Sequence, residues 1–346
     1  MQSIKEANLE NKTILVRADL DVAEGEDFRL KVLIPTIDYL LENQCKIIII
    51  GHRGRPNGIL DSRLSLLPVF ENLKKVLANS KVNTFHFFAD VCEGDASEAV
   101  ENLSACDIMM MENLRFCSGE ESNNKQFAQS LAKLADIFVN DAFANSHREH
   151  ASMVGIPKFL PSYMGLRITE EIKVLSEAMK DPERPAVAII GGAKVETKAP
   201  CIDNLSKIYD NILIGGRIGI VSKEKKEFII EDREKDKNNI VIFPVDYAGS
   251  EQYDIGENTI EKYKEIISKA KTIIWNGPMG KFEDDEFING TREIAEAVIN
   301  SKAHTVIGGG DTIAALNKLK IPLDKFNWVS TGGGAMLNQL SVNNDQ

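Results

Sequence analysis

The chain has 346 residues and a formal net charge of -11, with 43% hydrophobic and 27% charged residues. This length favours two domains, and the acidic balance argues against a nucleic-acid-binding protein, which would need a basic stripe. The first residues lack the apolar core of a signal peptide, and no apolar run approaches the ~20 residues of a membrane-spanning helix. We therefore expect a cytoplasmic protein that binds neither nucleic acid nor membrane.

Short β-branched runs alternate with longer amphipathic stretches along the chain. Strands are predicted at residues 13–16, 45–50, 83–88, 107–111 and 137–140 in the first half, and at 186–190, 211–214, 240–243, 272–275, 305–307 and 328–330 in the second. Helices are predicted between them, at residues 64–77, 125–134, 257–270 and 286–299. Continuous apolar runs such as Lys46–Ile50 are typical of central strands in a parallel sheet. The alternation predicts an α/β fold with mainly parallel, doubly wound sheets.

The chain is expected to divide near residues 161–185. A helix predicted at 166–179 connects the two halves, and the prolines of Asp181-Pro182-Glu183-Arg184-Pro185 end it, because proline disfavours helix in the residue before it. We assign residues 1–165 to an N-terminal domain, 166–184 to a hinge helix and linker, 185–330 to a C-terminal domain, and 331–346 to a segment that returns toward the hinge and the N-terminal domain.

The cysteines give little support for a zinc site or a disulfide framework. They are scattered, and none forms a Cys-x-x-Cys pair: Cys45, Cys92, Cys106, Cys117 and Cys201. We therefore expect the reduced thiols of a cytosolic protein.

Two segments of the first half are suited to binding phosphate, and both follow predicted strands. They are Gly51-His52-Arg53-Gly54-Arg55-Pro56 and Glu112-Asn113-Leu114-Arg115-Phe116. Ligands of open α/β sheets bind at the carboxyl ends of strands, and the planar fork of arginine suits a phosphate or a carboxylate. Asp19 and Asp21 also follow a strand and lie on one face, where two carboxylates can accept hydrogen bonds from a hydroxylated ligand.

Each of these residues also has a purely structural interpretation. Aspartates in a turn commonly cap the local backbone, and a single arginine is more often part of a surface salt bridge than a ligand. His147 and His150 are spaced as a possible metal pair, but no nearby cysteine or carboxylate pattern supports one. Several arginines at the strand ends of one sheet favour an anion site over these alternatives.

The second half holds three glycine runs, each after a predicted strand. Residues 191–198 combine glycines with Lys194 and Lys198, which lie one helical turn apart. This is not the Gly-x-x-x-x-Gly-Lys-Ser/Thr loop, so the usual phosphate-loop family is excluded. Residues 308–312 open a helix whose N–H groups can hold phosphates, and Asp311 can hold magnesium. Together with the third run, at 330–334, they favour a nucleotide polyphosphate.

These motifs, taken in order, resemble phosphoglycerate kinase over nearly the full length of the chain. The matching stretches are residues 16–22, 51–56, 112–116, 138–143 with His147 and Arg148, 191–198, 275–283, 308–312 and 330–335. The resemblance implies two Rossmann-like domains joined by a hinge helix. The N-terminal domain would bind 3-phosphoglycerate or 1,3-bisphosphoglycerate, and the C-terminal one magnesium with ADP or ATP. It further implies a monomer that closes about its hinge and transfers a phosphoryl group reversibly between 1,3-bisphosphoglycerate and ADP in glycolysis.

The resemblance also implies roles for individual residues. The implied glycerate-phosphate site comprises Asp19, Asp21, Arg29, His52, Arg55, Arg115 and Arg148. The implied nucleotide site comprises Lys198, Gly215, Asn276, Glu283, Gly309, Gly310, Asp311 and Thr312, with Asp311 as the magnesium ligand. The implied catalytic residues are Arg29, Lys194, Gly310 and Gly333. Phosphoryl transfer needs positioning and charge neutralisation, so no nucleophile–base pair is required.

The sequence departs from the family pattern at two places that bear on binding. Asp21 stands where the family usually has asparagine, and residues 223–239 replace a helix and loop that help to enclose the adenine. The first change adds a carboxylate beside anions, which should weaken substrate binding unless neighbouring arginines offset it. The second change predicts a weak preference for ATP over GTP.

Two other functions compete with an active kinase. A catalytically silent, nucleotide-binding regulatory protein on the same scaffold would have no need of the transfer residues, yet all are present: Arg29, Lys194, Lys198 and Asp311. A nicotinamide dehydrogenase is disfavoured because no Gly-x-Gly-x-x-Gly follows the first strand of either half. An active kinase is the favoured interpretation.

Overall fold

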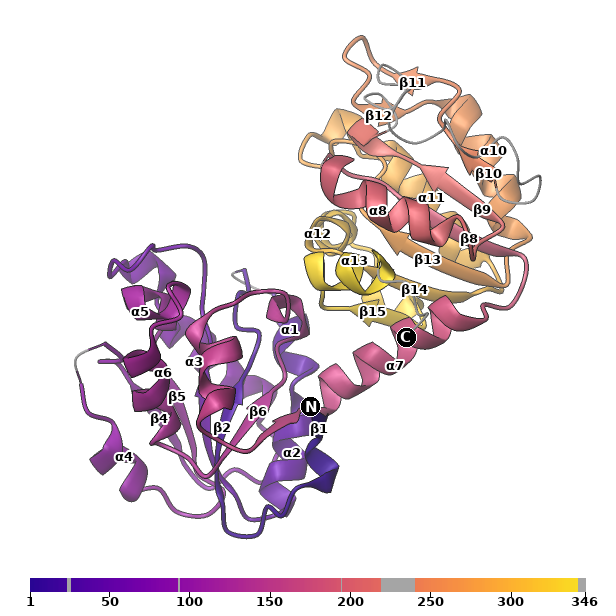
Figure 1. Cartoon of the computed structure of the whole chain (residues 1–346). Coiled ribbons are helices and arrows are strands. Elements are labelled where there is room, and N and C mark those ends of the chain that lie inside the picture. The colour runs from indigo at the N-terminus through magenta and orange to yellow at the C-terminus, as the bar shows by residue number, and fades with distance from the viewer. Residues whose placement is uncertain (24–25, 93, 194, 219–239, 342–346) are drawn as a thin grey trace. The chain divides into compact units, whose positions relative to one another are not determined.

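The computed structural model describes residues 1–346 apart from 24–25, 93, 194, 219–239 and 342–346. The chain forms two compact units, Met1–Glu171 and Ile172–Gln346, each built around its own sheet (Figure 1). The division falls inside helix α7, Leu166–Lys180. The domain limits and roles that we assigned from the sequence stay predictions.

The first unit is a parallel sheet with helices between its strands. In chain order it contains β1 (Gln2–Ser3), β2 (Thr13–Arg17), α1 (Phe28–Lys31), α2 (Ile34–Glu42), β3 (Lys46–Ile50), α3 (Leu67–Val76), β4 (Phe85–Phe88), α4 (Ser97–Glu101), β5 (Ile108–Met111), α5 (Ser118–Glu121), α6 (Lys125–Ala132), β6 (Ile137–Asn140) and β7 (Ser162–Met164). Its described strands form one seven-stranded sheet in the order β1-β7-β6-β2-β3-β5-β4, and every pair is parallel.

The apolar strand residues of this sheet alternate between two cores, one on each face. Ile14 and Val16 of β2 share a core with residues of α2 and α3, whereas Leu15 belongs to a second core with residues of α6. The isoleucines of β3 divide between the two cores in the same way. These runs are apolar throughout because helices cover both faces of a doubly wound sheet.

The second unit repeats this plan. It contains β8 (Ala186–Ile190), α8 (Val195–Leu205), β9 (Asn211–Ile214), β10 (Ile240–Ile242), β11 (Tyr247–Ala248), β12 (Asp254–Ile255), α10 (Glu257–Ser268), β13 (Thr272–Asn276), α11 (Asn289–Asn300), β14 (His304–Gly308), α12 (Gly310–Lys318), β15 (Trp328–Ser330) and α13 (Gly334–Ser341). The described strands form a six-stranded parallel sheet in the order β10-β9-β8-β13-β14-β15, with β11 and β12 as a separate antiparallel pair. Helices α8 and α13 contact each other on one face, and α10 and α11 contact each other on the opposite face (Figure 1).

The two large sheets confirm the predicted α/β fold with mainly parallel, doubly wound sheets. In each sheet the strand order reverses at the first long strand: β2 lies between β3 and β6, and β8 lies between β9 and β13. Ligands of such sheets bind in the crevice at this reversal, beyond the carboxyl ends of the strands. Among the helices that the structure describes, none combines the length and the apolar character needed to cross a bilayer.

One sequence expectation about the cysteines is wrong in this structure. Cys92 and Cys117 are joined by a disulfide, with their Cα atoms 5.4 Å apart, whereas Cys45, Cys106 and Cys201 are free and buried. Cys92 follows β4 and Cys117 follows β5, and these strands are parallel neighbours. The topology therefore brings together two cysteines that the sequence separates by 25 positions.

Candidate active site

A buried ion pair lies beyond the carboxyl end of β2. Arg29 Nη1, from α1, lies 3.2 Å from each carboxylate oxygen of Asp19 and donates to the Asp21 carbonyl at 2.9 Å. Burial raises the pKa of the Asp19 carboxyl, and the nearby cations Arg29 and Arg17 oppose that rise. The pair thus fixes the guanidinium of Arg29 at the sheet's point of reversal.

The turn after β3 is held between two of the predicted site residues. Gly54 has a φ of 63°, which favours glycine, and its N–H donates to Asp21 Oδ1 at 2.9 Å. Its carbonyl accepts from Arg115 Nη1 at 2.7 Å. The carboxylate of Asp21, which departs from the family pattern, is therefore engaged with a backbone N–H.

A cluster of positive charge surrounds His52, which is 1% exposed. Burial, together with Arg17, Arg115 and Arg148, holds the pKa of His52 well below its usual range. Burial, followed by the charge of Arg148, lowers the pKa of Arg115 to about 10. Arg55 lies on the same turn as His52, and its side chain is exposed. The structure therefore brings the predicted glycerate-phosphate residues to one edge of the first sheet.

Several donors in this cluster are buried and lack an acceptor. Within the part of the chain that the structure describes, Arg29 Nε, Arg115 Nη2 and Arg148 Nε have no hydrogen-bond partner. A buried charged donor without an acceptor is costly, because it has lost its hydration and gained nothing in return. An anionic ligand bound beside such a donor would supply the acceptor that it lacks.

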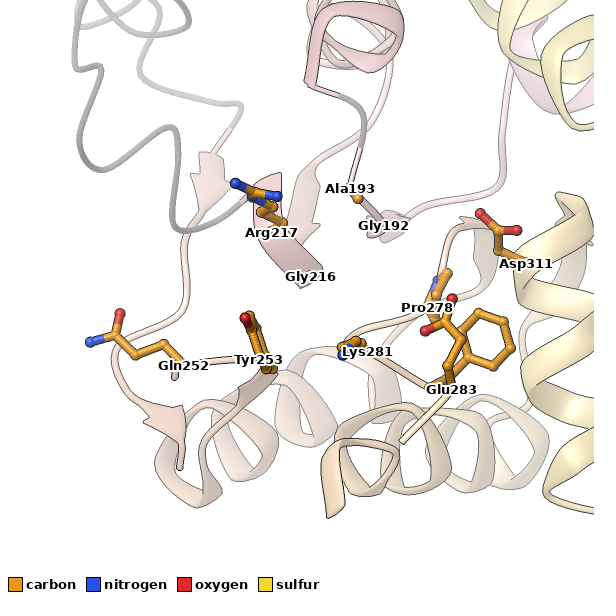
Figure 2. A pocket seen from close by; sticks show the side chains of 12 residues that line it. Gly192, Ala193, Gly216, Arg217, Gln252, Tyr253, Pro278, Lys281, Glu283 and Asp311 are labelled. Atoms are coloured by element: carbon orange, nitrogen blue, oxygen red, sulfur yellow. The ribbon is translucent and has the colours of Figure 1, made fainter. Parts of the chain in front are cut away.

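The second unit has a cavity of about 320 Å³ beyond the carboxyl ends of β8, β9 and β13. Figure 2 shows its lining residues, which come from the turns after β8, β9 and β13, from the loop before β12 and from the first turn of α12. The lining residues are Gly192, Ala193, Gly216, Arg217, Gln252, Tyr253, Pro278, Gly280, Lys281, Phe282, Glu283 and Asp311. The predicted residues Glu283 and Asp311 thus share one cavity.

Lys198 lies on α8, buried behind the turn that follows β8. Its ammonium group donates to the carbonyl oxygens of Gly191 and, at 3.1 Å, Asn276. Burial lowers the pKa of Lys198 to about 8, and the charge of Asp311 partly opposes this. Lys198 therefore connects the ends of the two central strands and is close to losing its charge.

The start of α12 is shaped by glycine. Gly309 has a φ of 101°, and a Cβ added to Gly310 would meet no heavy atom within 4 Å. A Cβ on Gly333 would lie 3.6 Å from the Gly310 nitrogen, so the backbones of the two predicted catalytic glycines are neighbours. The free N–H groups of a helix start can bind phosphate at such an open position.

Comparison with known proteins identifies the family. The sequence matches the model of the family described as Phosphoglycerate kinase over residues 4–242 and 224–342. The phosphoglycerate kinase of Coprothermobacter proteolyticus is 36% identical, covering 98% of this chain and 96% of its own. That of Pseudothermotoga lettingae is 38% identical, covering 98% and 95%. The chain belongs to the phosphoglycerate kinase family.

Solved phosphoglycerate kinases have the same fold. The structure from Coxiella burnetii aligns with a TM-score of 0.79 at 32% identity, covering 98% of this chain and 95% of that one. The structure from Pyrococcus horikoshii aligns with a TM-score of 0.84 at 30% identity, covering 99% and 96%. The chain is accordingly a kinase of glycolysis that acts on a nucleotide and a small molecule, and a silent regulatory role is not favoured.

Three further residues expected in the nucleotide site of a phosphoglycerate kinase are buried around the glycine turns. A Cβ on Gly215 would lie 2.5 Å from Met279 Sδ, so a side chain there would force Met279 to shift. Asn276 ends β13 with its side chain against Met336. The Thr312 hydroxyl donates to the Gly308 carbonyl at 2.9 Å and accepts from the Gly277 N–H at 2.7 Å. The Thr312 hydroxyl is therefore engaged within the protein.

Sequence reasoning missed the aromatic side of the cavity. Tyr253 packs edge-on against Phe287 with ring centroids 5.3 Å apart, and Lys281 Nζ lies 5.1 Å from the Tyr253 ring centroid. The Lys281 N–H also donates to the Tyr253 carbonyl at 2.8 Å. Neither Tyr253 nor Gln252 belongs to a glycine motif, so no local pattern marks them.

Two parts of the sequence prediction, Lys194 and the segment 223–239, lie outside the described residues.

Proposed function

We propose that the first unit binds 3-phosphoglycerate or 1,3-bisphosphoglycerate, that the second binds ADP or ATP, and that a phosphoryl group passes reversibly between them. The observation that carries this proposal is a set of buried arginine donors that have no acceptor within the described part of the chain: Arg29 Nε, Arg115 Nη2 and Arg148 Nε. A chain with a net charge of -11 repels anions overall, so it must concentrate positive charge where it binds them. The other predicted site residues support the proposal because they lie near the carboxyl ends of the strands in each sheet.

The proposed chemistry uses charge and backbone N–H groups. The acyl phosphate and the nucleotide supply the reacting oxygens, so the protein has to neutralise charge and align them. Arg29 and Lys194 are proposed to act on the phosphoryl group in transit, with the N–H groups of Gly310 and Gly333. Closure of the chain about its hinge region would then precede transfer.

We further propose that the nucleotide carries Mg²⁺, held by Asp311. This carboxylate is exposed to the cavity at the first turn of α12. The described residues contain no cluster of three or more metal-binding side chains. That is compatible with Mg²⁺, which is usually bound by one or two carboxylates, substrate phosphates and water. Bound there, the ion would neutralise phosphate charge.

A coupled assay with 3-phosphoglycerate, magnesium and ATP tests the function. Turnover that requires all three supports the proposal, and nucleotide binding without turnover would favour the silent alternative.

We also propose a cytoplasmic monomer, on the basis of the family's role in glycolysis. The Cys92–Cys117 disulfide argues against this location, because cytosolic thiols are kept reduced.

Replacing Lys198 with methionine is expected to raise the nucleotide KM by ~10-fold or more while changing kcat less, because a charged contact to phosphate is lost. Because burial lowers the lysine pKa to about 8, its charge disappears as the pH rises through that value. The affinity of the parent protein for ADP should therefore fall above about pH 8. At such pH, Lys198 should take up a proton when ADP binds. Calorimetry in two buffers measures both quantities. Lys207→Met, which removes an exposed lysine paired with Asp203, is the control. Equal ADP affinity in Lys198→Met and parent would contradict the assignment.

Base selectivity is expected to be weak. The family's adenine-enclosing segment corresponds to residues 223–239, which are shortened here. Affinity should then rest on the phosphates and on burial of the base against Tyr253 and Phe282, and an aromatic face contacts any base. We expect kcat/KM for ATP to exceed that for GTP by less than ~10²-fold. A larger preference would mean that polar groups in the cavity, such as Gln252 or Arg217, select the base.

A further inference from the structure

A buried chain of hydrogen bonds runs behind His52. Glu120 accepts from the Ser152 backbone N–H at 2.9 Å and from the Ser152 hydroxyl at 2.5 Å. That hydroxyl accepts from Arg17 Nε at 2.9 Å, and Arg17 Nη2 lies 2.7 Å from His52 Nδ1. All four side chains are buried. The chain joins three elements, because Arg17 ends β2, Glu120 lies on α5 and Ser152 lies on the short π-helix Ala151–Gly155.

The direction of the bond to the ring follows from elementary chemistry. A guanidinium group has only donors, so Arg17 must donate to His52. Nδ1 of His52 is therefore the accepting nitrogen, and the single proton of the neutral ring lies on Nε2. We infer that Arg17, Ser152 and Glu120 are positioning residues that hold His52 as a neutral imidazole with its proton on Nε2.

The charges around His52 favour the same state. Burial comes first, and the groups that act on the ring are then Arg17, Arg115, Arg148 and His150, all of which lower its pKa. Burial lowers the pKa of Arg17, and the nearby carboxylates of Glu120, Asp19 and Asp21 oppose that fall. A second proton on Nδ1 of His52 would have to face the Arg17 cation and would find no acceptor there.

This inference rests on the proposed glycerate-phosphate site and defines the part of His52 in it. A neutral ring with its proton on Nε2 donates one directed hydrogen bond to a carboxylate or phosphate oxygen. It contributes no charge and takes up no proton near neutral pH. The arginines therefore supply the attraction, and His52 supplies the orientation of the bound anion.

Nuclear magnetic resonance of the protein labelled with ¹⁵N-histidine tests this state directly. The chain has five histidines, and the signals of His52 are those that disappear in His52→Gln. We expect an unprotonated Nδ1 and a protonated Nε2, unchanged from about pH 5 to about pH 8, the range in which an ordinary histidine changes charge. A proton on Nδ1, or titration inside that range, would overturn the inference.

A double variant tests whether the chain of residues imposes this state. Arg17→Met combined with Glu120→Gln removes both buried charges together, so that neither is left unpaired. His52 should then titrate within the same pH range. The KM for 3-phosphoglycerate should fall as the pH drops, because the ring becomes a cation beside an anion. A folded double variant in which His52 still does not titrate would exclude the positioning role.

A milder variant keeps the inference testable if the double variant does not fold. Ser152→Ala leaves both charges and removes the hydroxyl between them. We expect the KM for 3-phosphoglycerate to rise between about threefold and about tenfold with kcat nearly unchanged, the effect of one weakened hydrogen bond to a charged ligand. Ser130→Ala, which removes an exposed hydroxyl that donates to the Phe127 carbonyl, is the matched control. A parental KM in Ser152→Ala would count against the inference.

Failure of the inference and failure of the proposed site give different results. If His52→Gln leaves the KM for 3-phosphoglycerate unchanged, His52 is not a substrate ligand, whatever its protonation state. If that KM rises but the resonance experiment finds a proton on Nδ1, the site assignment stands and the positioning role of Arg17, Ser152 and Glu120 is wrong.

Discussion

Replacement of Arg29 with alanine is expected to lower kcat by ~10³-fold or more, the usual contribution of an arginine that stabilises a phosphoryl group in transit. The guanidinium is held by Asp19 and by the Asp21 carbonyl, and its buried Nε has no acceptor among the residues that the structure describes. It is therefore preorganised for charge that develops during transfer. ADP affinity should not change, because Arg29 belongs to the first unit and the nucleotide cavity to the second. Steady-state kinetics and calorimetry with ADP measure the two quantities.

Controls separate the chemical role of Arg29 from a structural one. Arg63→Ala removes an exposed arginine that pairs with its neighbour Asp61 at 2.8 Å, and it should leave kcat unchanged. Alanine at position 29 removes one of the two cations that act on buried Asp19, so the Asp19 pKa should rise further. Arg29→Ala combined with Asp19→Asn removes that complication. Turnover within a few-fold of the parent in both variants would remove Arg29 from the mechanism.

The sequence predicted the long strands well because their signal is local. Runs such as Ile47–Ile50 are apolar throughout, which is typical of a strand buried on both faces. The shortest strands were missed, since Gln2–Ser3 and Asp254–Ile255 are too short to show a period of two. Gln2–Ser3 pairs with Tyr163–Met164, so only the tertiary fold determines that these two residues form a strand. Asp254–Ile255 pairs locally with Tyr247–Ala248, but each of these strands has only two residues.

The glycine and arginine motifs of the site were also predictable, because each follows a strand whose carboxyl end forms the crevice. The groups behind them were not. Glu120 and Ser152 act through contacts with residues far away in the sequence, and Tyr253 reaches the cavity from a loop without a motif. The Cys92–Cys117 disulfide was not predicted for the same reason, because it is the pairing of two parallel strands that brings the cysteines together. A local sequence pattern identifies a site residue that directly follows the strand that positions it. It misses a residue that reaches the site only through contacts with elements distant in sequence.

Replacement of Gly310 with valine is expected to raise the nucleotide KM by ~10²-fold or more and to lower kcat, without unfolding the protein. A Cβ at this position meets no heavy atom within 4 Å, so the side chain has room in the free protein. That room is the space in front of the first turn of α12, where the helix N–H groups are free to hold phosphate. A displacement of the phosphates by about 1 Å is enough to cost ~10²-fold in rate.

The control for Gly310→Val is Ala314→Val, which adds a β-branched side chain to an exposed position of the same helix. Valine has a lower helix propensity than alanine and a higher one than glycine, so Ala314→Val should unfold at a slightly lower temperature and Gly310→Val should lose no helix stability. Only Gly310→Val should lose nucleotide affinity, measured by calorimetry with ADP, and turnover, measured by the coupled assay. If Gly310→Val unfolds at the parental temperature and binds ADP as the parent does, the phosphates do not approach the start of α12. The glycines of residues 308–310 would then serve only the turn between β14 and that helix.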